Sequence, residues 1–274
     1  MSASRQIDAD VAVVGSGFAG SLIALALRRR GRRVVLVERG RHPRFAIGES
    51  STPLANLLLE ELADRYELPR LRSFSKWGTW QRAHPDVACG LKRGFTFFFH
   101  QPGQPFVDNE QHDRQLMVAA SPFDEVSDTH WYRPDFDHAL LREAQDEGAD
   151  YLDETALHAC DDSGPRAVLT GIRNRHALRI TADFVVDASG PRGFMHQVLG
   201  LPPATLRWLP HTHGLYSHFE HVDRWDRLTP DEGTPYRPDD AALHHVFPGG
   251  WIWMLRFNNG ITSAGAALTD QFAS

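Results

Sequence analysis

The feature that most constrains this chain is a glycine-rich turn close to its start. An apolar, β-branched run over residues 9–14 leads into Gly15-Ser16-Gly17-Phe18-Ala19-Gly20, and an alanine- and leucine-rich stretch over 21–30 follows. In a strand–turn–helix of this form the first glycine allows a tight turn, the second lets the backbone approach a pyrophosphate, and the third lets the helix pack on the strand. The free amides and the positive dipole end of the helix then hold the phosphates. The turn therefore predicts a phosphate-binding βαβ unit.

An acidic residue follows at the distance that a dinucleotide site requires. A second apolar strand over residues 33–37 ends in Glu38, about 20 residues beyond the glycines, where a carboxylate accepts hydrogen bonds from an adenosine ribose. An ordinary βαβ unit with a glycine-rich turn would leave Glu38 unexplained, so we interpret the segment as a dinucleotide site. A basic turn over 39–44 comes next, and it either faces the phosphates or is a solvated loop. The binding residues predicted at this point are Gly15, Gly17, Phe18, Ala19, Gly20, Glu38 and Arg39.

Charge and hydropathy exclude several other classes of protein. The net charge of the 274 residues is −6 and no basic block is present, which argues against a nucleic-acid partner. No apolar run approaches the roughly 20 residues of a membrane-spanning helix, and the N-terminus has no apolar signal core. Two cysteines suggest neither a disulfide framework nor a metal site, and we interpret the histidine pairs at 211/213 and 244/245 as ordinary strand and loop residues. We therefore expect a cytoplasmic protein with no metal site and no membrane partner.

Lysine is scarce in this chain. Of the 29 basic residues only Lys76 and Lys92 are lysine, and the others are arginine. A source with arginine-favouring codons would explain the bias. Because a guanidinium cannot lose its proton or act as a nucleophile, the two lysines are still candidates for positions where an amine is needed.

The remaining patterns indicate two interleaved domains. Apolar spacing predicts helices over 54–65 and 134–147, and a buried strand over 184–190 returns to the parallel sheet. Aromatic runs over 77–80 and 91–100, together with a β-rich C-terminal region, predict an antiparallel sheet. The predicted fold class is α/β, with a Rossmann-like dinucleotide-binding domain over 1–75 and 120–203 interleaved with an antiparallel β-sheet substrate domain over 76–119 and 204–274.

Several motifs together make the whole chain resemble the flavin-dependent halogenase branch of the FAD monooxygenase superfamily. The segment Lys92-Arg93-Gly94-Phe95-Thr96-Phe97 fits the Lys-x-Gly-x-x-Phe pattern of halogenases that act on phenols, pyrroles and related aromatics. Trp251-Ile252-Trp253 is similar to the first half of the family's Trp-x-Trp-x-Ile-Pro motif, whose final Ile-Pro is absent here. The other matching segments are the Gly15/Gly17/Gly20–Glu38 fingerprint, Ile47–Pro53, Arg133 before Phe136-Asp137, and Asp187–Gly190.

The resemblance implies a specific mechanism and a set of site residues. Reduced FAD (FADH2) reacts with oxygen to give a flavin hydroperoxide, chloride or bromide attacks it to form hypohalous acid, and Lys92 presents the halogen to an electron-rich aromatic carbon. From the residues alone, burial among phenylalanines would lower the pKa of the Lys92 amine, although a lysine with its amine in solvent at a strand end is the alternative and Lys76 is the rival. The resemblance adds Ser50, Arg133, Ala188 and Gly190 to the FAD site and places Trp251, Trp253 and Phe97 in the substrate pocket.

The resemblance also implies partners. A separate flavin reductase would supply the reduced cofactor, because no NAD(P)H site is evident, and the substrate would be an aromatic small molecule, free or tethered to a carrier protein. The family continues with a Gly-Asp motif and a helical region that these 274 residues do not contain, so we expect a substrate domain that is C-terminally incomplete. The alternatives are an FAD-dependent monooxygenase, hydroxylase or reductase of the same superfamily, or an inactive truncated flavin-binding fragment.

Overall fold

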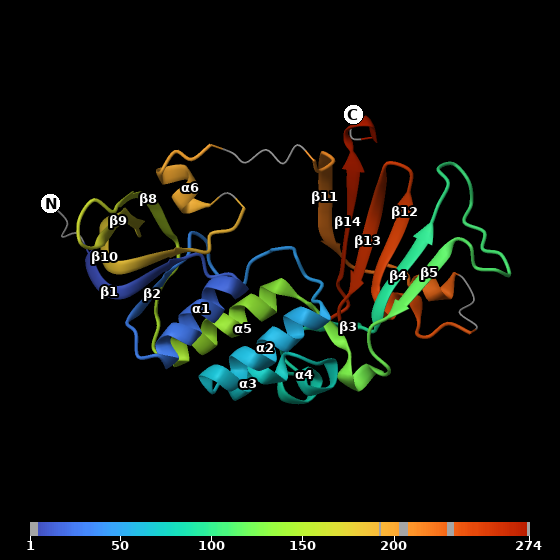
Figure 1. The fold of residues 1–274 in the computed structure, drawn as a ribbon, viewed down its shortest axis with the longest axis horizontal. Coiled ribbons are helices and arrows are strands. Elements are labelled where there is room, and N and C mark those ends of the chain that lie inside the picture. The colour runs from blue at the N-terminus through green and yellow to red at the C-terminus, as the bar shows by residue number, and fades with distance from the viewer. Residues whose placement is uncertain (1–4, 192, 203–207, 229–232, 273–274) are drawn as a thin grey trace. The chain divides into compact units, whose positions relative to one another are not determined.

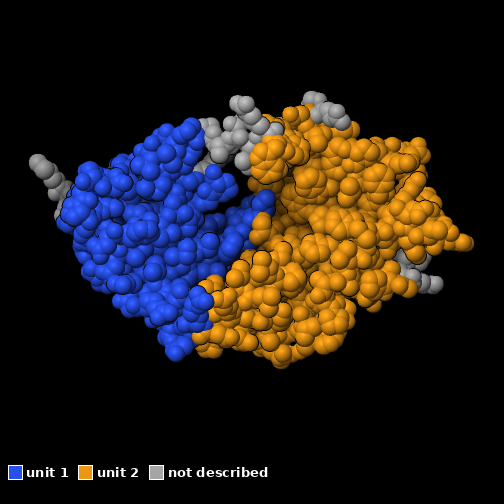
Figure 2. All heavy atoms as spheres, viewed as in Figure 1, with its two compact units in different colours: residues 1–47, 65–67, 133–205 blue, residues 48–64, 68–132, 206–274 orange. Residues whose placement is uncertain are grey.

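The computed structural model describes residues 5–191, 193–202, 208–228 and 233–272. The chain forms two compact units, coloured separately in Figure 2, which comprise residues 1–47, 65–67 and 133–205, and residues 48–64, 68–132 and 206–274. The domain boundaries predicted from the sequence after residues 75 and 119 stay predictions, because the division into two units does not test them. The predicted boundary at 203/204 lies outside the described residues.

The first unit is built on a six-stranded sheet with the order β7-β2-β1-β10-β9-β8 (Figure 1). The central strand β1 pairs in parallel with β2 and β10, and β7 continues the parallel part beyond β2, whereas β9 and β8 add an antiparallel edge. Its strands are β1 (Arg5–Val14), β2 (Val34–Val37), β7 (Asp150–Leu152), β8 (Thr155–Asp161), β9 (Ala167–Arg173) and β10 (His176–Asp187), and its helices are α1 (Phe18–Arg29), α5 (Arg133–Asp146) and α6 (Phe194–Val198).

Burial explains why this sheet forms at its centre. All residues of β2 are buried, and the inner half of β1 is buried as well, as expected of parallel strands covered on both faces. Helix α1 packs against β2 and against α5. The predicted return strand is the end of β10, where Val186 lies opposite Val13 of β1. The predicted Rossmann-like fold is thereby confirmed.

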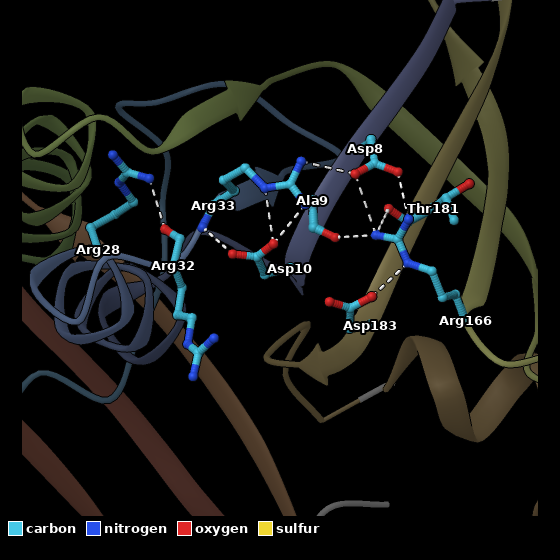
Figure 3. A network of polar contacts seen from close by, with 9 residues as sticks. All are labelled: Asp8, Ala9, Asp10, Arg28, Arg32, Arg33, Arg166, Thr181 and Asp183. Carbon is cyan, nitrogen blue, oxygen red and sulfur yellow. Dashed lines mark hydrogen bonds and ion pairs between the residues drawn. The ribbon is translucent and has the colours of Figure 1, made fainter.

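Exposed charged side chains link neighbouring strands of this sheet (Figure 3). The guanidinium of Arg33 donates to Asp10 at 2.7 and 2.9 Å and to Asp8 at 2.9 Å, and Arg166 bridges Asp8 and Asp183 at 2.6 and 2.5 Å. Exposed ion pairs of this kind contribute little individually, so the network is a minor part of what holds the unit together.

The second unit is built on a six-stranded sheet with the order β11-β14-β13-β12-β4-β5, in which β12 and β4 are parallel and the other pairs antiparallel. Its strands are β4 (Gly94–Phe99), β5 (Gln115–Ala119), β11 (Thr212–Phe219), β12 (Ala242–Phe247), β13 (Gly250–Arg256) and β14 (Thr262–Thr269). A two-stranded sheet joins β3 (Cys89–Lys92) to β6 (Asp128–Trp131). The remaining elements are α2 (Pro53–Tyr66), α3 (Pro69–Ser73), α4 (Trp77–Ala83) and the short 3-10 turns η1 (Asp124–Val126), η2 (Trp225–Arg227), η3 (Pro238–Asp240) and η4 (Asp270–Phe272).

The strand predicted over residues 77–80 is wrong, because these residues form helix α4. Trp80 is fully buried there, donates its indole N–H to the carbonyl of Val87 at 2.8 Å, and packs edge-on against Phe74 at 4.7 Å. The tertiary packing of the Trp80 side chain thus outweighs the preference of this short aromatic segment for a strand.

The run predicted as one strand over residues 91–100 is divided between two sheets at Arg93. The backbone N–H of Arg93 donates to the carbonyl of Asp240 at 2.7 Å, and its carbonyl accepts the N–H of Ala120 at 2.9 Å. These bonds lie outside the ladders of β3 and β4, so Lys92 ends the small sheet and Phe95 and Phe97 belong to the large one.

Candidate functional site

The glycine turn of the first unit is shaped by close backbone approaches. Gly15 has a φ of +102°, and a Cβ atom there would collide with the carbonyl oxygen of Ala188, which follows β10. A Cβ on Gly20 would collide with the carbonyl oxygen of Gly15. Gly17 is the N-cap of α1. A Cβ atom on Gly17 would lie 3.4 to 3.7 Å from surrounding side-chain atoms, which is ordinary contact distance. The turn therefore places a half-buried glycine backbone at the start of a helix, which is the kind of position that holds phosphates.

Glu38 is held by hydrogen bonds at the end of β2. Its Oε1 accepts the N–H of Gly40 at 2.9 Å, and its Oε2 accepts both the N–H and the Oγ–H of Ser16 at 3.1 and 3.0 Å. Burial raises the pKa of the Glu38 carboxyl, but these donors and the nearby guanidinium of Arg44 outweigh it, and the pKa lies below its usual value. Glu38 is therefore an anion at neutral pH.

Two arginines bring positive charge to the glycine turn. Arg133, at the start of α5, pairs through Nε and Nη2 with both oxygens of Asp137 at 2.7 and 2.8 Å, and its guanidinium lies 4.7 Å from the centre of the Phe18 ring. Arg44 lies 3.5 Å from Glu38 through Nη2, whereas its Nε is buried and has no hydrogen-bond partner among the described residues. A buried guanidinium N–H of this kind points to an anionic ligand.

A cavity of about 400 Å³ lies beside these groups within the first unit. This is a size typical of small-molecule sites, which span roughly 300–1,000 Å³. Four of the predicted binding residues line the cavity, and Arg44, Ala156 and Ser189 line it with them. The four are Gly15, Glu38, Arg39 and Ala188.

Lys92 is the centre of a second candidate site, in the second unit. The residue is fully buried, its Nζ donates to the carbonyl oxygen of Ser51, and it lies 4.1 Å from the centre of the Phe95 ring. Burial lowers the pKa of the Lys92 amine to about 8, and the carboxylate of Asp128 partly opposes the shift. The buried amine is therefore neutral in part at physiological pH.

Asp128 is the cross-strand partner of Lys92 in the small sheet. Its Oδ1 accepts a hydrogen bond from the side-chain amide of Asn56 at 2.6 Å, and its buried Oδ2 has no hydrogen-bond partner among the described residues. Opposed residues in an antiparallel pair have Cβ atoms about 5 Å apart, so this carboxylate is the natural counter-charge of the amine. Neighbouring His130 is also buried, which lowers its pKa to about 3 and keeps it neutral.

An aromatic row on the large sheet extends from the lysine. The register places Phe97 opposite His244, His244 opposite Trp253, and Trp253 opposite Gly265. The rings of Phe95 and Phe97 stack at 6.5 Å, and those of Phe97 and His244 at 4.8 Å. Strand alternation puts Trp251 on the same face as Trp253. The three predicted pocket residues, Phe97, Trp251 and Trp253, therefore share one face with the ring that Lys92 covers.

The structure also separates some predicted residues. Ser50 is exposed and forms an isolated bridge with His130 in the second unit, next to the carbonyl that Lys92 contacts. Gly190 has a φ of +89° after β10, and Phe18 and Ala19 lie in the first turn of α1. Lys76, the rival lysine, is partly exposed before α4.

The sequence prediction missed Ser16, Asp128 and His244, and left Arg44 within an undecided turn. Ser16 could have been singled out as the residue between the first two glycines. Asp128 and His244 reach their places through strand pairing, for which the sequence carries no local signal. Within the described ranges no group of three His, Cys, Asp or Glu side chains is placed to hold a metal ion. No described helix has both the length and the apolar character needed to cross a membrane.

Known proteins resemble this chain in sequence and in fold. The family model described as FAD dependent oxidoreductase matches residues 10–268. Monodechloroaminopyrrolnitrin halogenase PrnC of Pseudomonas fluorescens is 33% identical over 91% of this chain and 43% of its own length, and tetracycline 7-halogenase of Kitasatospora aureofaciens is 30% identical over 91% and 44%. The crystal structure of halogenase PltM in complex with phloroglucinol and FAD superposes with a TM-score of 0.87 at 27% identity, over 96% of this chain and 52% of that one. The chain thus spans about half the length of the proteins it matches.

Proposed function

Because this chain belongs to the family of FAD dependent oxidoreductases, we propose that it is an FADH2-dependent halogenase that uses chloride or bromide and acts on electron-rich aromatic substrates through Lys92. The observation that carries the proposal is the buried, partly neutral amine of Lys92 over the Phe95 ring. The similarity to two curated halogenases and to a halogenase structure supports it.

The residues of the first unit fit FAD. The buried Nε of Arg44 without a described partner, the half-buried backbone of Gly17 at the N-cap of α1 and the cavity bordered by Glu38 suit a pyrophosphate and a ribose. The residues that would hold the cofactor are Gly15, Gly17, Phe18, Ala19, Gly20, Glu38, Arg39, Arg44, Arg133, Ala188 and Gly190, with Ser50 assigned by resemblance alone. When bound and reduced, FAD together with dioxygen supplies the oxidising power that converts a halide ion into hypohalous acid.

Lys92 would then act as the nucleophile toward that acid. The lone pair of its neutral amine attacks the halogen, the N–halogen bond forms as the O–halogen bond breaks, and the departing oxygen takes the displaced amine proton to leave as water. Desolvation makes the neutral amine available near pH 8 instead of pH 10.5. An aromatic carbon next attacks the halogen, which returns the electron pair to the nitrogen.

Asp128 would maintain a balance between the two forms of that amine. Its negative charge stabilises the ammonium form, and without it burial would lower the pKa of Lys92 further. We expect Asp128→Asn to move the acid limb of the halogenation rate toward lower pH, with Asn56→Ala giving a weaker shift in the same direction because Asn56 only holds the carboxylate. An unchanged pH profile in Asp128→Asn would remove Asp128 from the mechanism.

The proposal includes two partners. A separate flavin reductase would deliver reduced FAD, and the substrate would be an aromatic small molecule or an aromatic acyl group on a carrier protein. Exposed Trp251 and half-buried Trp253 with Phe97 offer a flat aromatic surface on which either ring would stack.

The test uses the full chain with FAD, a flavin reductase, NADH, oxygen and bromide. Products formed from a panel of phenols and pyrroles are identified by mass spectrometry. Lys92→Arg is the matched variant, because arginine keeps the positive charge but cannot lose its proton. Lys76→Arg is the control for the rival lysine. We expect brominated product in the chain and in Lys76→Arg, and none in Lys92→Arg, with reoxidation of the reduced flavin by oxygen retained in all three. A hydroxylated product would instead favour the monooxygenase alternative, whereas bromination that survives in Lys92→Arg would remove Lys92 from the halogenation step.

A further inference from the structure

Ser16 and His42 link the glycine turn of the first unit to the basic turn that follows β2. The Oγ atom of Ser16 lies 2.8 Å from Nε2 of His42 and 3.0 Å from Oε2 of Glu38. Ser16 is fully buried and His42 is only 9% exposed, so water competes little for these contacts. One buried hydroxyl group therefore joins the imidazole of the basic turn to the carboxylate at the end of β2.

The single hydroxyl proton of Ser16 determines the direction of both hydrogen bonds. Glu38 is an anion whose carboxylate can only accept, so the Oγ–H of Ser16 donates to its Oε2. The imidazole of His42 must then donate its Nε2–H to the Ser16 oxygen, which leaves Nδ1 without a proton. Burial and the positive charge of Arg44 lower the pKa of His42, and nearby carboxylates oppose this only in part. His42 is therefore a neutral imidazole with its proton on Nε2.

The donors around Glu38 leave its carboxylate one position at which to accept a ligand. A carboxylate has about four lone-pair positions. The N–H and the Oγ–H of Ser16 occupy the two of Oε2, and the N–H of Gly40 occupies one of Oε1 at 2.9 Å. Glu38 also lines the cavity of the first unit. The remaining lone pair of Oε1 is therefore the acceptor available to a ligand hydroxyl in that cavity.

We propose that His42 is a positioning residue for the ribose of the cofactor: by donating to Ser16 it holds the Ser16 hydroxyl on Oε2 and keeps Oε1 of Glu38 directed at one ribose hydroxyl. The proposal rests on the FAD binding proposed above. Neither Ser16 nor His42 is among the described residues that line the cavity, so both act through Glu38. The ring of His42 is itself stacked on His138 of α5, with centroids 6.1 Å apart. Without the imidazole, the Ser16 hydroxyl is free to rotate away and the carboxylate loses a fixed donor.

Binding of the adenosine half of FAD tests this role without flavin chemistry. The probes are ADP and 2′,3′-dideoxy-ADP, which lacks both ribose hydroxyls, and titration calorimetry measures their affinities for the full chain. A hydroxyl that donates to a carboxylate predicts that ADP binds about tenfold more tightly than the dideoxy analogue. In His42→Leu this preference should fall to about twofold, because one neutral hydrogen bond is lost, while the dideoxy analogue binds as before. His42→Gln, whose amide can still donate to Ser16, should retain most of the preference. His176→Leu, at an exposed histidine that begins β10, should not change it.

A double-mutant cycle separates positioning through Ser16 from a general loss of structure. Ser16→Ala should lower the ADP preference about as much as His42→Leu does, and the two changes together should lower it no further. A preference that persists in His42→Leu, or an equal loss of affinity for both ligands, would overturn the proposal and leave the FAD site in place. If the unsubstituted chain binds neither FAD nor ADP, or binds both probes equally, the cofactor role of Glu38 fails together with the role of His42. Bromination of phenol enters neither affinity, so a failure of the halogenase proposal is recognised separately.

Discussion

The two candidate sites of this protein are built from different parts of the polypeptide. The candidate dinucleotide site of the first unit is centred on one stretch from β1 through Arg44, with the start of β8 and the turn after β10 beside it. The lysine site of the second unit is made of buried side chains from separate strands, with Lys92 and Asp128 brought together by strand pairing and the Phe95 ring beside the amine. The dinucleotide site therefore depends on glycines, where a side chain would collide with the backbone. The lysine site depends on charged groups that are buried away from water.

The largest effect should come from filling space in the first site. In Gly20→Val the new Cβ meets the carbonyl oxygen of Gly15, so we expect a loss of at least about 4 kcal/mol in the free energy of unfolding and no FAD binding. Gly31→Ala is the matched control, because Gly31 has a φ of +73° but open space around it, and should cost only about 1–2 kcal/mol. Urea unfolding and flavin fluorescence measure the two quantities. Equal losses in both variants would mean that the close approach of Gly20 to Gly15 does not limit the turn.

The next effect concerns charge in the second site. Between about pH 8 and 10.5 the unfolded chain keeps the Lys92 proton that the folded chain has released, so the free energy of unfolding should rise with pH across this window. Relative to Lys92→Met, which cannot titrate, the rise should reach about 3 kcal/mol. Chemical denaturation at a series of pH values provides the measurement. A constant difference between the two proteins would contradict the lowered pKa.

Glu38 makes a smaller prediction for the first site, in a more acidic range of pH. The pKa of Glu38 is lowered on folding, so its contribution is present above the ordinary value of 4.5 and is lost as the pH falls through the lower folded value. We expect Glu38→Gln to cost about 2 kcal/mol at pH 7, since it removes the negative charge and replaces one of the two accepting oxygens with an amide nitrogen that cannot accept, and the deficit to shrink in acid. FAD affinity should fall with it. A deficit that stays constant down to pH 3 would indicate that shape rather than charge is lost.

The smallest effect should come from the exposed network of Figure 3, which belongs to neither site. Asp8→Asn removes one acceptor of Arg33 and Arg166, and we expect a slight decrease in Tm that disappears at high salt. FAD binding and halogenation should not change. A large, salt-independent loss of Tm would show that the network supports the sheet on which the dinucleotide site is built.

The contrast between the sites also explains what the sequence could predict. The glycine turn and Glu38 lie in one local stretch whose spacing is itself the signal, and the strands on either side follow from their apolar patterns. Lys92 could be found from a local motif and from the rarity of lysine. Its surroundings could not, because Asp128 reaches it through strand register, which depends on contacts between distant segments. The same dependence makes Trp77–Trp80 a helix: a buried site for Trp80 decides the local structure, and no pattern within the four residues reveals it.

The central claim is that the Lys92 nitrogen itself carries the halogen, and mass spectrometry of the chain tests it most directly. The full chain is given FAD, reductase, NADH, oxygen and bromide without an aromatic substrate, then digested rapidly and compared with a sample prepared without bromide. The account predicts a bromine on the peptide that contains Lys92, lost when phenol is added and absent from Lys92→Arg. Bromine confined to tryptophan or tyrosine peptides, while the chain still brominates phenol, would contradict it.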